Sequence, residues 1–429
     1  MKLISFSRER FNLLADITAV ALAASLPWST SITAICAVLF LLTVIPTVDL
    51  AAARRIVLCP AGAIPVLLVA LGVAGMLWAD VPWRERTDGI GSFLKLLFVP
   101  LLLYHFSHSA RSREVLAGFL VSCGLLLVAS FALKIWPSLP WFRYIDTQGV
   151  PVKDYISQSA MFIVCVFMFL KFAADAWTDG QRIVSLALSA IAIVFLANVL
   201  YVATSRTSLV AIVVLLVAFG YRQFGWKGSA ALLVSFFLLA AAAWPSASYL
   251  RARVSSLITE IETYQPGGQA TSAGERLTFW TKSLGFIKEA PVFGHGTGSI
   301  RDQFRRSTVG QTGMAAQVAA NPHNQILAVG IQLGAAGIVL LFVMWAAHLA
   351  LFRLDGIASW AGLVIVIQNI VGSQFNSHLF DFTHGWLYVV GIGVAGGTVL
   401  RERAQRTKKP LADSRPAGPE TANSVAELK

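Results

Sequence analysis

Apolar runs about 20 residues long alternate with short polar breaks along most of this chain. A membrane-spanning helix needs about 20 mostly apolar residues, so the pattern predicts about twelve spans. We place them at 11–27, 31–48, 61–79, 89–106, 113–135, 156–174, 182–203, 207–223, 228–245, 325–351, 357–374 and 384–400. The seventh and eighth spans are separated only by the short turn around Thr204-Ser205-Arg206.

These runs predict an all-α polytopic membrane protein in four parts. Spans 1 to 9 occupy residues 1–245, and spans 10 to 12 occupy residues 323–401. Between them, residues 246–322 form the only long hydrophilic stretch between spans. Residues 402–429 are polar and contain proline, which predicts a disordered tail.

Composition agrees with this architecture. The 429 residues are 56% hydrophobic and only 13% charged, against about 25% charged in soluble proteins. This excludes a soluble globular domain and a disordered chain. The net charge of +12 could suggest nucleic acid, but the basic residues lie in short loops between apolar runs. Such loops set orientation and contact anionic lipids, so we expect membrane lipids as partners and no nucleic acid.

The Lys and Arg residues predict the orientation of the chain. With the N-terminus inside, the inner loops and tail contain 17 of them and the short outer loops contain five. Because inner loops carry the positive excess, both termini are predicted to be cytoplasmic and the 246–322 loop to lie outside. No cleavable signal peptide is visible, so the first run is expected to be retained. The four cysteines lie in or beside apolar runs, without a CxxC pair, and are read as small packing residues.

The long loop contains a predicted helix. Ser272 and Glu275 are spaced as a capping box, and Leu277, Trp280, Leu284 and Ile287 recur at helical spacing. The helix should end before Pro291. Such a helix is expected to lie on the membrane surface or to cap the bundle.

Ionisable residues at a membrane boundary mark functional sites by default. Arg206, Arg276 and His323 lie on the predicted outer side. Guanidinium groups bind phosphate oxygens bidentately and stay charged, so two converging arginines match a diphosphate diester. The chain contains neither DxD nor HExxH, and His378 and His384 are six residues apart, so we expect no metal and no cofactor.

Each candidate also has a purely structural interpretation. Arg206 could extend its side chain to the interface, Arg276 could belong to a solvated helix face, and His323 could only open a span. Trp280 could be a packing residue, and Asp381 could cap the last span.

Three stretches resemble the bacterial O-antigen ligase and polymerase superfamily. They are HNQILAVGIQLGAAGI from His323 to Ile338, GERLTFWTKSLGFIKEAPVFGHGTGS from Gly274 to Ser299, and TSRTSL around Arg206. The similarity extends from about Thr204 to Leu340. Many members carry an acidic residue two positions before the first glycine of GxxG, where this chain has Gln332.

The resemblance implies a metal-independent transferase of the GT-C class in the inner membrane. It would transfer a glycan from undecaprenyl diphosphate to the lipid A–core on the periplasmic face. His323 would be the general base, Arg206 and Arg276 would hold the diphosphate, and Asn324, Trp280, Asp381 and Arg301 are possible supporting residues.

Other functions stay open. An O-antigen polymerase or a protein O-oligosaccharyltransferase would use the same donor. A polysaccharide or anion transporter also suits twelve spans, with Lys95 and Lys134 as the main candidates for a permeation path, although no inverted repeat with broken helices is visible. A non-enzymatic scaffold has no positive support in the sequence.

Overall fold

The computed structural model describes residues 2–139, 149–245, 248–262 and 271–408. Every regular element in these ranges is helical. The N-terminal elements are α1 (Lys2–Ser25), α2 (Thr30–Val44), η1 (Ile45–Thr47), α3 (Leu50–Leu58), α4 (Pro60–Gly75), α5 (Trp83–Leu94), η2 (Lys95–Leu97), α6 (Phe98–His108), α7 (Ser112–Ile135), α8 (Tyr155–Thr178) and α9 (Arg182–Tyr201). They are followed by α10 (Arg206–Ala243), α11 (Ser248–Glu262), α12 (Ser272–Glu289), α13 (Ile300–Ser307), η3 (Gly313–Ala316), α14 (Gln325–Leu351), α15 (Ile357–Gly372) and α16 (Phe382–Lys408).

Each predicted span coincides with a helix or part of one, except that 89–106 extends from α5 through η2 into α6. Eight helices in the described ranges are long and apolar enough to cross a membrane, or nine when the sharply bent pair α3 and α4 counts as one span. Helix α15 is apolar but has only 16 residues. The structure therefore confirms a polytopic helical membrane protein, and the number twelve stays a prediction.

Helix α10 contains two of the predicted spans. It breaks at Gly225, where φ is 70° and ψ is −169°. A Cβ atom on Gly220 would lie 2.7 Å from the Cα of Ser229, and the Ser229 hydroxyl donates to the Val217 carbonyl at 2.8 Å. These contacts show that residues after Gly225 turn back along the residues before it, as two spans joined by a short turn require.

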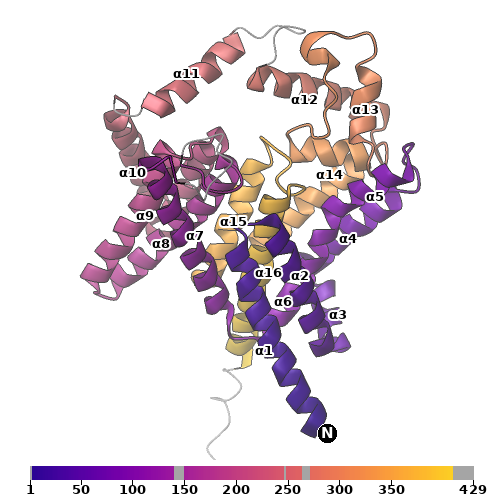
Figure 1. Ribbon diagram of the computed structural model, residues 1–429. Helices are drawn as coiled ribbons and strands as arrows, with labels where there is room; N and C mark the ends of the chain where they lie inside the picture. Colours follow the sequence, from indigo (N-terminus) through magenta and orange to yellow (C-terminus); the bar gives the residue numbers. More distant parts are fainter. Residues whose placement is uncertain (1, 140–148, 246–247, 263–270, 409–429) are drawn as a thin grey trace, which may run out of the picture.

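The helices pack around one large apolar core. Pairs α8 with α9, α6 with α16 and α1 with α2 and α7 make the closest lateral contacts. Figure 1 places the N-terminus and the end of α16 at one end of the bundle and α11, α12 and α13 at the other. The N-terminus and the end of α16 therefore share a side of the bundle.

The prediction of a disordered segment from residue 402 is wrong for its first part. Helix α16 continues to Lys408, and Arg403 donates to the carbonyl of Leu351 at 2.6 Å. Residues 409–429 lie outside the described ranges.

Candidate functional site

Arg206 is the first residue of α10. The Ser205 side chain caps this helix by accepting from the Ser208 amide at 3.0 Å, and both hydroxyls meet Ser159 of α8. This cluster fixes the turn that the sequence predicted around Arg206. The guanidinium donates to Glu260 Oε1 at 2.9 Å and to the Ser256 hydroxyl at 3.2 Å, both on α11.

Arg276 lies in the first turn of α12. The second oxygen of Glu260 accepts from the backbone of Ala273 at 2.9 Å, so one carboxylate joins the start of α12 to Arg206. Burial lowers the pKa of Arg276, and the charge of Arg206 lowers it further. Two guanidinium groups therefore lie close enough to repel each other. The hydrogen bond from Arg206 is the main reason that the pKa of Glu260 falls below its ordinary value.

His323 adopts the left-handed backbone conformation, with φ of 54°, which a residue other than glycine rarely occupies. Its amide donates to Asn321 Oδ1 at 2.8 Å, and its ring lies nearly parallel to that of Phe279 of α12. Its Nδ1 lies 3.2 Å from Asn376 Oδ1. An amide oxygen only accepts, so Nδ1 carries the proton and neutral His323 keeps its lone pair on Nε2.

The electrostatic surroundings favour the neutral form of His323. Burial lowers its pKa below 6.5, the hydrogen bond with Asn376 opposes this, and the charge of Arg276 lowers it further. Arg206 and His323 both have contacts with α12, the helix of Arg276: Arg206 through Glu260, and His323 through the ring of Phe279. A ring that is neutral near pH 7, with Nε2 unprotonated, is able to accept a proton.

The glycine-rich segment after α12 fills a break in α14. Gly334, the first glycine of the GxxG pattern, has φ of 60° and ψ of −154° and interrupts the helix. The amides of His295 and Gly296 donate to the carbonyls of Ile331 and Gln332 at 2.8 and 2.9 Å. In return, Ala335 and Ala336 donate to the carbonyls of Pro291 and Val292 at 2.8 and 3.1 Å. The predicted tenth span is thus broken rather than continuous.

Gln332 takes part in the same junction. Its side-chain oxygen accepts from the Gly298 amide at 2.8 Å, and its nitrogen donates to the carbonyl of Ala328 at 3.1 Å. A carboxylate could make the first of these bonds. Gln332 stands where many members of the superfamily carry an acidic residue, and it still accepts the hydrogen bond from the loop.

Two details of the α12 prediction are wrong. The N-cap is Thr271, whose hydroxyl accepts from Gly274, and Glu275 instead accepts from Gln317. The buried face contains Phe279, Ser283 and Phe286, whereas Leu277 and Leu284 are exposed. Phe279 and Phe286 pack with residues of α13 and α14 in a second, small core, so α12 caps the bundle. The helix ends at Glu289, before Pro291, as predicted.

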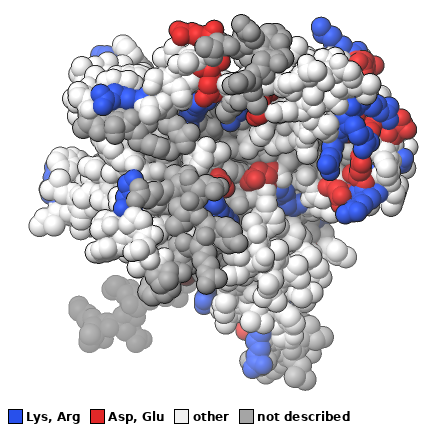
Figure 2. Space-filling view, turned by 45° about the horizontal axis from the view of Figure 1, so that its top comes forward, with Lys and Arg blue, Asp and Glu red and all other residues white. Residues whose placement is uncertain are grey.

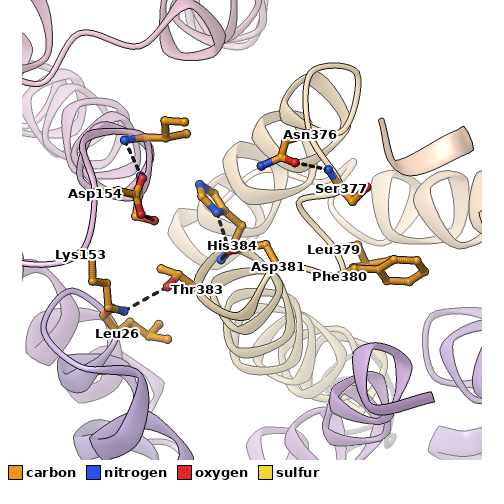
Figure 3. Close-up of polar contacts among 12 residues, drawn as sticks. Leu26, Lys153, Asp154, Asn376, Ser377, Leu379, Phe380, Asp381, Thr383 and His384 are labelled. Carbon is orange, nitrogen blue, oxygen red and sulfur yellow. Dashed lines mark hydrogen bonds and ion pairs between the residues drawn. The ribbon is translucent and has the colours of Figure 1, made fainter. Parts of the chain in front are cut away.

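The four possible supporting residues have different surroundings. Asn324 caps α14 by accepting from Ile326 and Leu327 at 2.9 and 3.2 Å. Asp381 accepts from the amide and the Nδ1 of His384, which caps α16 (Figure 3). Trp280 is half-buried, and its Nε1 has no hydrogen-bond partner among the described residues. Arg301 is exposed on α13.

A cavity of about 400 Å³ opens beside this region. It is lined by α5, α13, α14 and the loops around Asn321 and Asp381, and it contains Arg301. In the described ranges, no group of three His, Cys, Asp or Glu side chains is arranged to hold a metal ion.

The two lysines considered for a transport path have different surroundings. Lys95 is buried, and its ammonium donates to the carbonyls of Phe380 and Asp381 at 2.9 and 2.7 Å. Lys134 is exposed near the end of α7. The contacts of Lys95 stabilise the loop before α16.

Sequence reasoning missed three residues of the site. Asn376 holds the His323 ring, Asn321 bridges His323 and Ser377, and Glu260 joins Arg206 to α12. The polar run QFNSHLFD between two apolar spans was the available signal for Asn376. No signal distinguished Glu260 from the other acidic residues of the loop.

The fold and site define a polytopic membrane protein with a cationic, histidine-containing site at one end of its helix bundle. Comparison with known proteins indicates the family to which such a membrane protein is similar. The family model described as O-antigen ligase matches residues 191–342, which supports membership of the O-antigen ligase superfamily. Membership implies a ligase- or polymerase-type enzyme, resembling glycosyltransferases, that acts on lipid-linked polysaccharides in a membrane.

The chain is also similar to a Haemophilus influenzae protein described as uncharacterized. The two are 24% identical over 308 residues, which cover 67% of this chain and 71% of that protein.

Proposed function

We propose that this protein is an O-antigen ligase of the inner membrane. It transfers O-antigen polysaccharide from undecaprenyl diphosphate to a sugar hydroxyl of lipid A–core on the periplasmic face, without a metal. The observation that supports this best is that Glu260 joins Arg206 to the start of α12, the helix that carries Arg276, while Phe279 of the same helix lies against the His323 ring.

Arg206 and Arg276 bind the diphosphate of the donor. Their mutual repulsion, only partly offset by Glu260, is relieved when a dianionic ligand lies between them. As the glycosidic bond breaks, they stabilise the charge that develops on the leaving group. The polyprenyl tail would lie in the outer leaflet between spans.

His323 acts as the general base. Its Nε2 takes the proton of the acceptor hydroxyl while the acceptor oxygen forms a bond to the anomeric carbon. The bond from that carbon to the diphosphate oxygen breaks, and its electron pair leaves with polyprenyl diphosphate. Direct attack inverts the anomeric centre. Helices α11 and α12 cover the reacting groups and limit hydrolysis of the donor.

A single reconstituted reaction tests this function. Purified protein in EDTA is given polyprenyl-linked glycan with rough lipopolysaccharide, a protein acceptor or no acceptor. We expect glycan on the lipopolysaccharide only. Elongated lipid-linked glycan would indicate a polymerase, and glycosylated protein would indicate an O-oligosaccharyltransferase. Dependence on Mg²⁺ would contradict the role given to the arginines, and movement of donor across vesicles without acceptor would indicate a transporter.

A further inference from the structure

The cavity beside the site has a charge opposite to that of the arginine pair. We call it the α5–α13 pocket and define it by Glu85, Asp88, Arg301, Asn321, Ser377 and Asp381. Its lining contains three carboxylates and one guanidinium, so acidic side chains outnumber basic ones there. A diphosphate would be repelled there, whereas Arg206 and Arg276 would attract it.

The helices that line the pocket and the helices of Arg206 and its partner Glu260 lie on different sides of α12. Helices α10 and α11 are on one side of α12, and α5 and α13 are on the other (Figure 1). Figure 2 shows acidic and basic side chains interleaved on the right flank, over α5 and α13. Arg306 of this patch pairs with Asp80 at 2.8 Å and with Asp302 at 2.6 Å.

Polar groups of the pocket lack protein partners. Asp88 and Arg301 are exposed and make no hydrogen bond or ion pair with the described residues. Oε2 of Glu85 is buried without a hydrogen-bond partner in those ranges. Both hydrogen bonds of the Asp381 carboxylate use Oδ1. Buried acceptors are nearly always satisfied, so the buried Oε2 of Glu85 indicates a ligand that donates a hydrogen bond.

The pocket wall is connected directly to His323. Asn321 Oδ1 accepts from the His323 amide at 2.8 Å and from the Ser377 hydroxyl at 2.7 Å. Asn321 Nδ2 donates to Asn376 Oδ1 at 2.8 Å, the same oxygen that holds the imidazole. A ligand in the pocket therefore lies against the residues that orient the proposed base.

We infer that the α5–α13 pocket binds the acceptor saccharide through hydroxyl or amino groups of a neutral or amino sugar. This rests on the proposed function, which requires a hydroxyl donor beside His323. Carboxylates accept strong hydrogen bonds from sugar hydroxyls, and about 400 Å³ lies within the usual range for small-molecule sites. His323 then separates an anionic acceptor pocket from a cationic donor site.

The test uses the full-length protein and two probes, the core oligosaccharide of rough lipopolysaccharide with and without its phosphates. The variant is Asp88→Asn, whose side chain is exposed and makes no hydrogen bond or ion pair with the described residues. Asp355→Asn, an exposed position that follows α14 at the other end of the bundle, is the matched control. Saturation-transfer NMR measures oligosaccharide binding without donor, and initial rates give KM for acceptor and donor.

We expect Asp88→Asn to raise the acceptor KM about tenfold, the effect of one charge-assisted hydrogen bond, with donor KM and kcat within twofold. The control should match the wild type, and the phosphorylated probe should bind more weakly than the phosphate-free one. A double variant, Asp88→Asn with Glu85→Gln, should raise the acceptor KM further at an unchanged melting temperature.

The two proposals fail in different ways. Normal transfer by the wild type with an unchanged acceptor KM in the double variant would overturn the pocket and leave the ligase function standing. Oligosaccharide binding that is lost in Asp88→Asn would support the pocket even if no glycan were transferred, which would count against the ligase function alone.

Discussion

Helices α10 and α14 begin in the same way and then differ. In both helices, a side chain at the site caps the first turn. Ser205 caps α10 just before Arg206, and Asn324 caps α14 just after His323. Each is later broken by a glycine with positive φ. Such a conformation is essentially confined to glycine, so the sequence requirement is the same in both.

The surroundings of the two breaks are not the same. A Cβ atom on Gly225 would meet nothing within 4 Å, whereas on Gly334 it would lie 2.5 Å from the backbone of Val292. The break in α10 lies 19 residues after Arg206 and only turns the chain between spans. The break in α14 lies 11 residues after His323 and holds the loop that carries α12. A helix break contributes to the site only where another segment fills it.

The largest effect is expected at the start of α14. His323→Ala should lower kcat by about 10²- to 10⁴-fold, the usual contribution of a positioned general base, while donor binding stays nearly intact. His108→Ala, an exposed histidine at the end of α6, is the control. Full ligation by His323→Ala at normal expression would remove the base assignment.

The second largest effect is expected when the Arg276 guanidinium is removed. Arg276→Ala removes a group that binds the diphosphate and stabilises its charge, so both donor affinity and turnover should fall, turnover by about 10²-fold. Steady-state kinetics with varied donor separate the two effects. An effect confined to the acceptor KM would place Arg276 in the wrong part of the site.

The contrast between the two glycines can be tested directly. Gly334→Ala should lower the melting temperature and reduce ligation at least tenfold, because its Cβ would strike the backbone of Val292. Gly225→Ala should cost about 1–3 kcal/mol from its backbone conformation alone and should retain activity. Thermal unfolding and initial rates measure both variants. Equal loss of ligation in the two would mean that the filled break has no special role.

Arg206→Lys tests the start of α10 with charge preserved. The lysine loses the planar fork that binds two phosphate oxygens, so donor KM should rise about tenfold. Arg84→Lys, exposed on α5, should have no effect. If Arg206→Lys behaved like the wild type, a simple interfacial role for Arg206 would suffice.

The smallest effect concerns pH. His323 must be neutral to accept a proton, so the rate falls as pH drops through its pKa. That pKa is below 6.5, and the acidic limb of kcat/KM should therefore lie below pH 6.5. Because the hydrogen bond with Asn376 raises the pKa, Asn376→Leu should move the limb to lower pH and reduce kcat severalfold. A limb that moved upward would contradict this arrangement.

The positions of the helices could be predicted from the sequence because membrane spans need long apolar runs. The break in α14 could not, since its glycines lie inside such a run and its filling by residues 291–296 is a tertiary contact. The face of α12 was assigned wrongly for a related reason. Phe279 and Phe286 are buried by α13 and α14, and Ile287 packs beside them, whereas Leu277 and Leu284 satisfy the same helical spacing but are exposed.

Binding of undecaprenyl diphosphate, without sugar and in EDTA, tests the central claim most directly. We predict that Arg206→Ala and Arg276→Ala each weaken its Kd at least tenfold, that added salt weakens the wild type, and that His323→Ala binds like the wild type. Equal affinity in all four proteins would contradict a diphosphate held by two arginines beside His323.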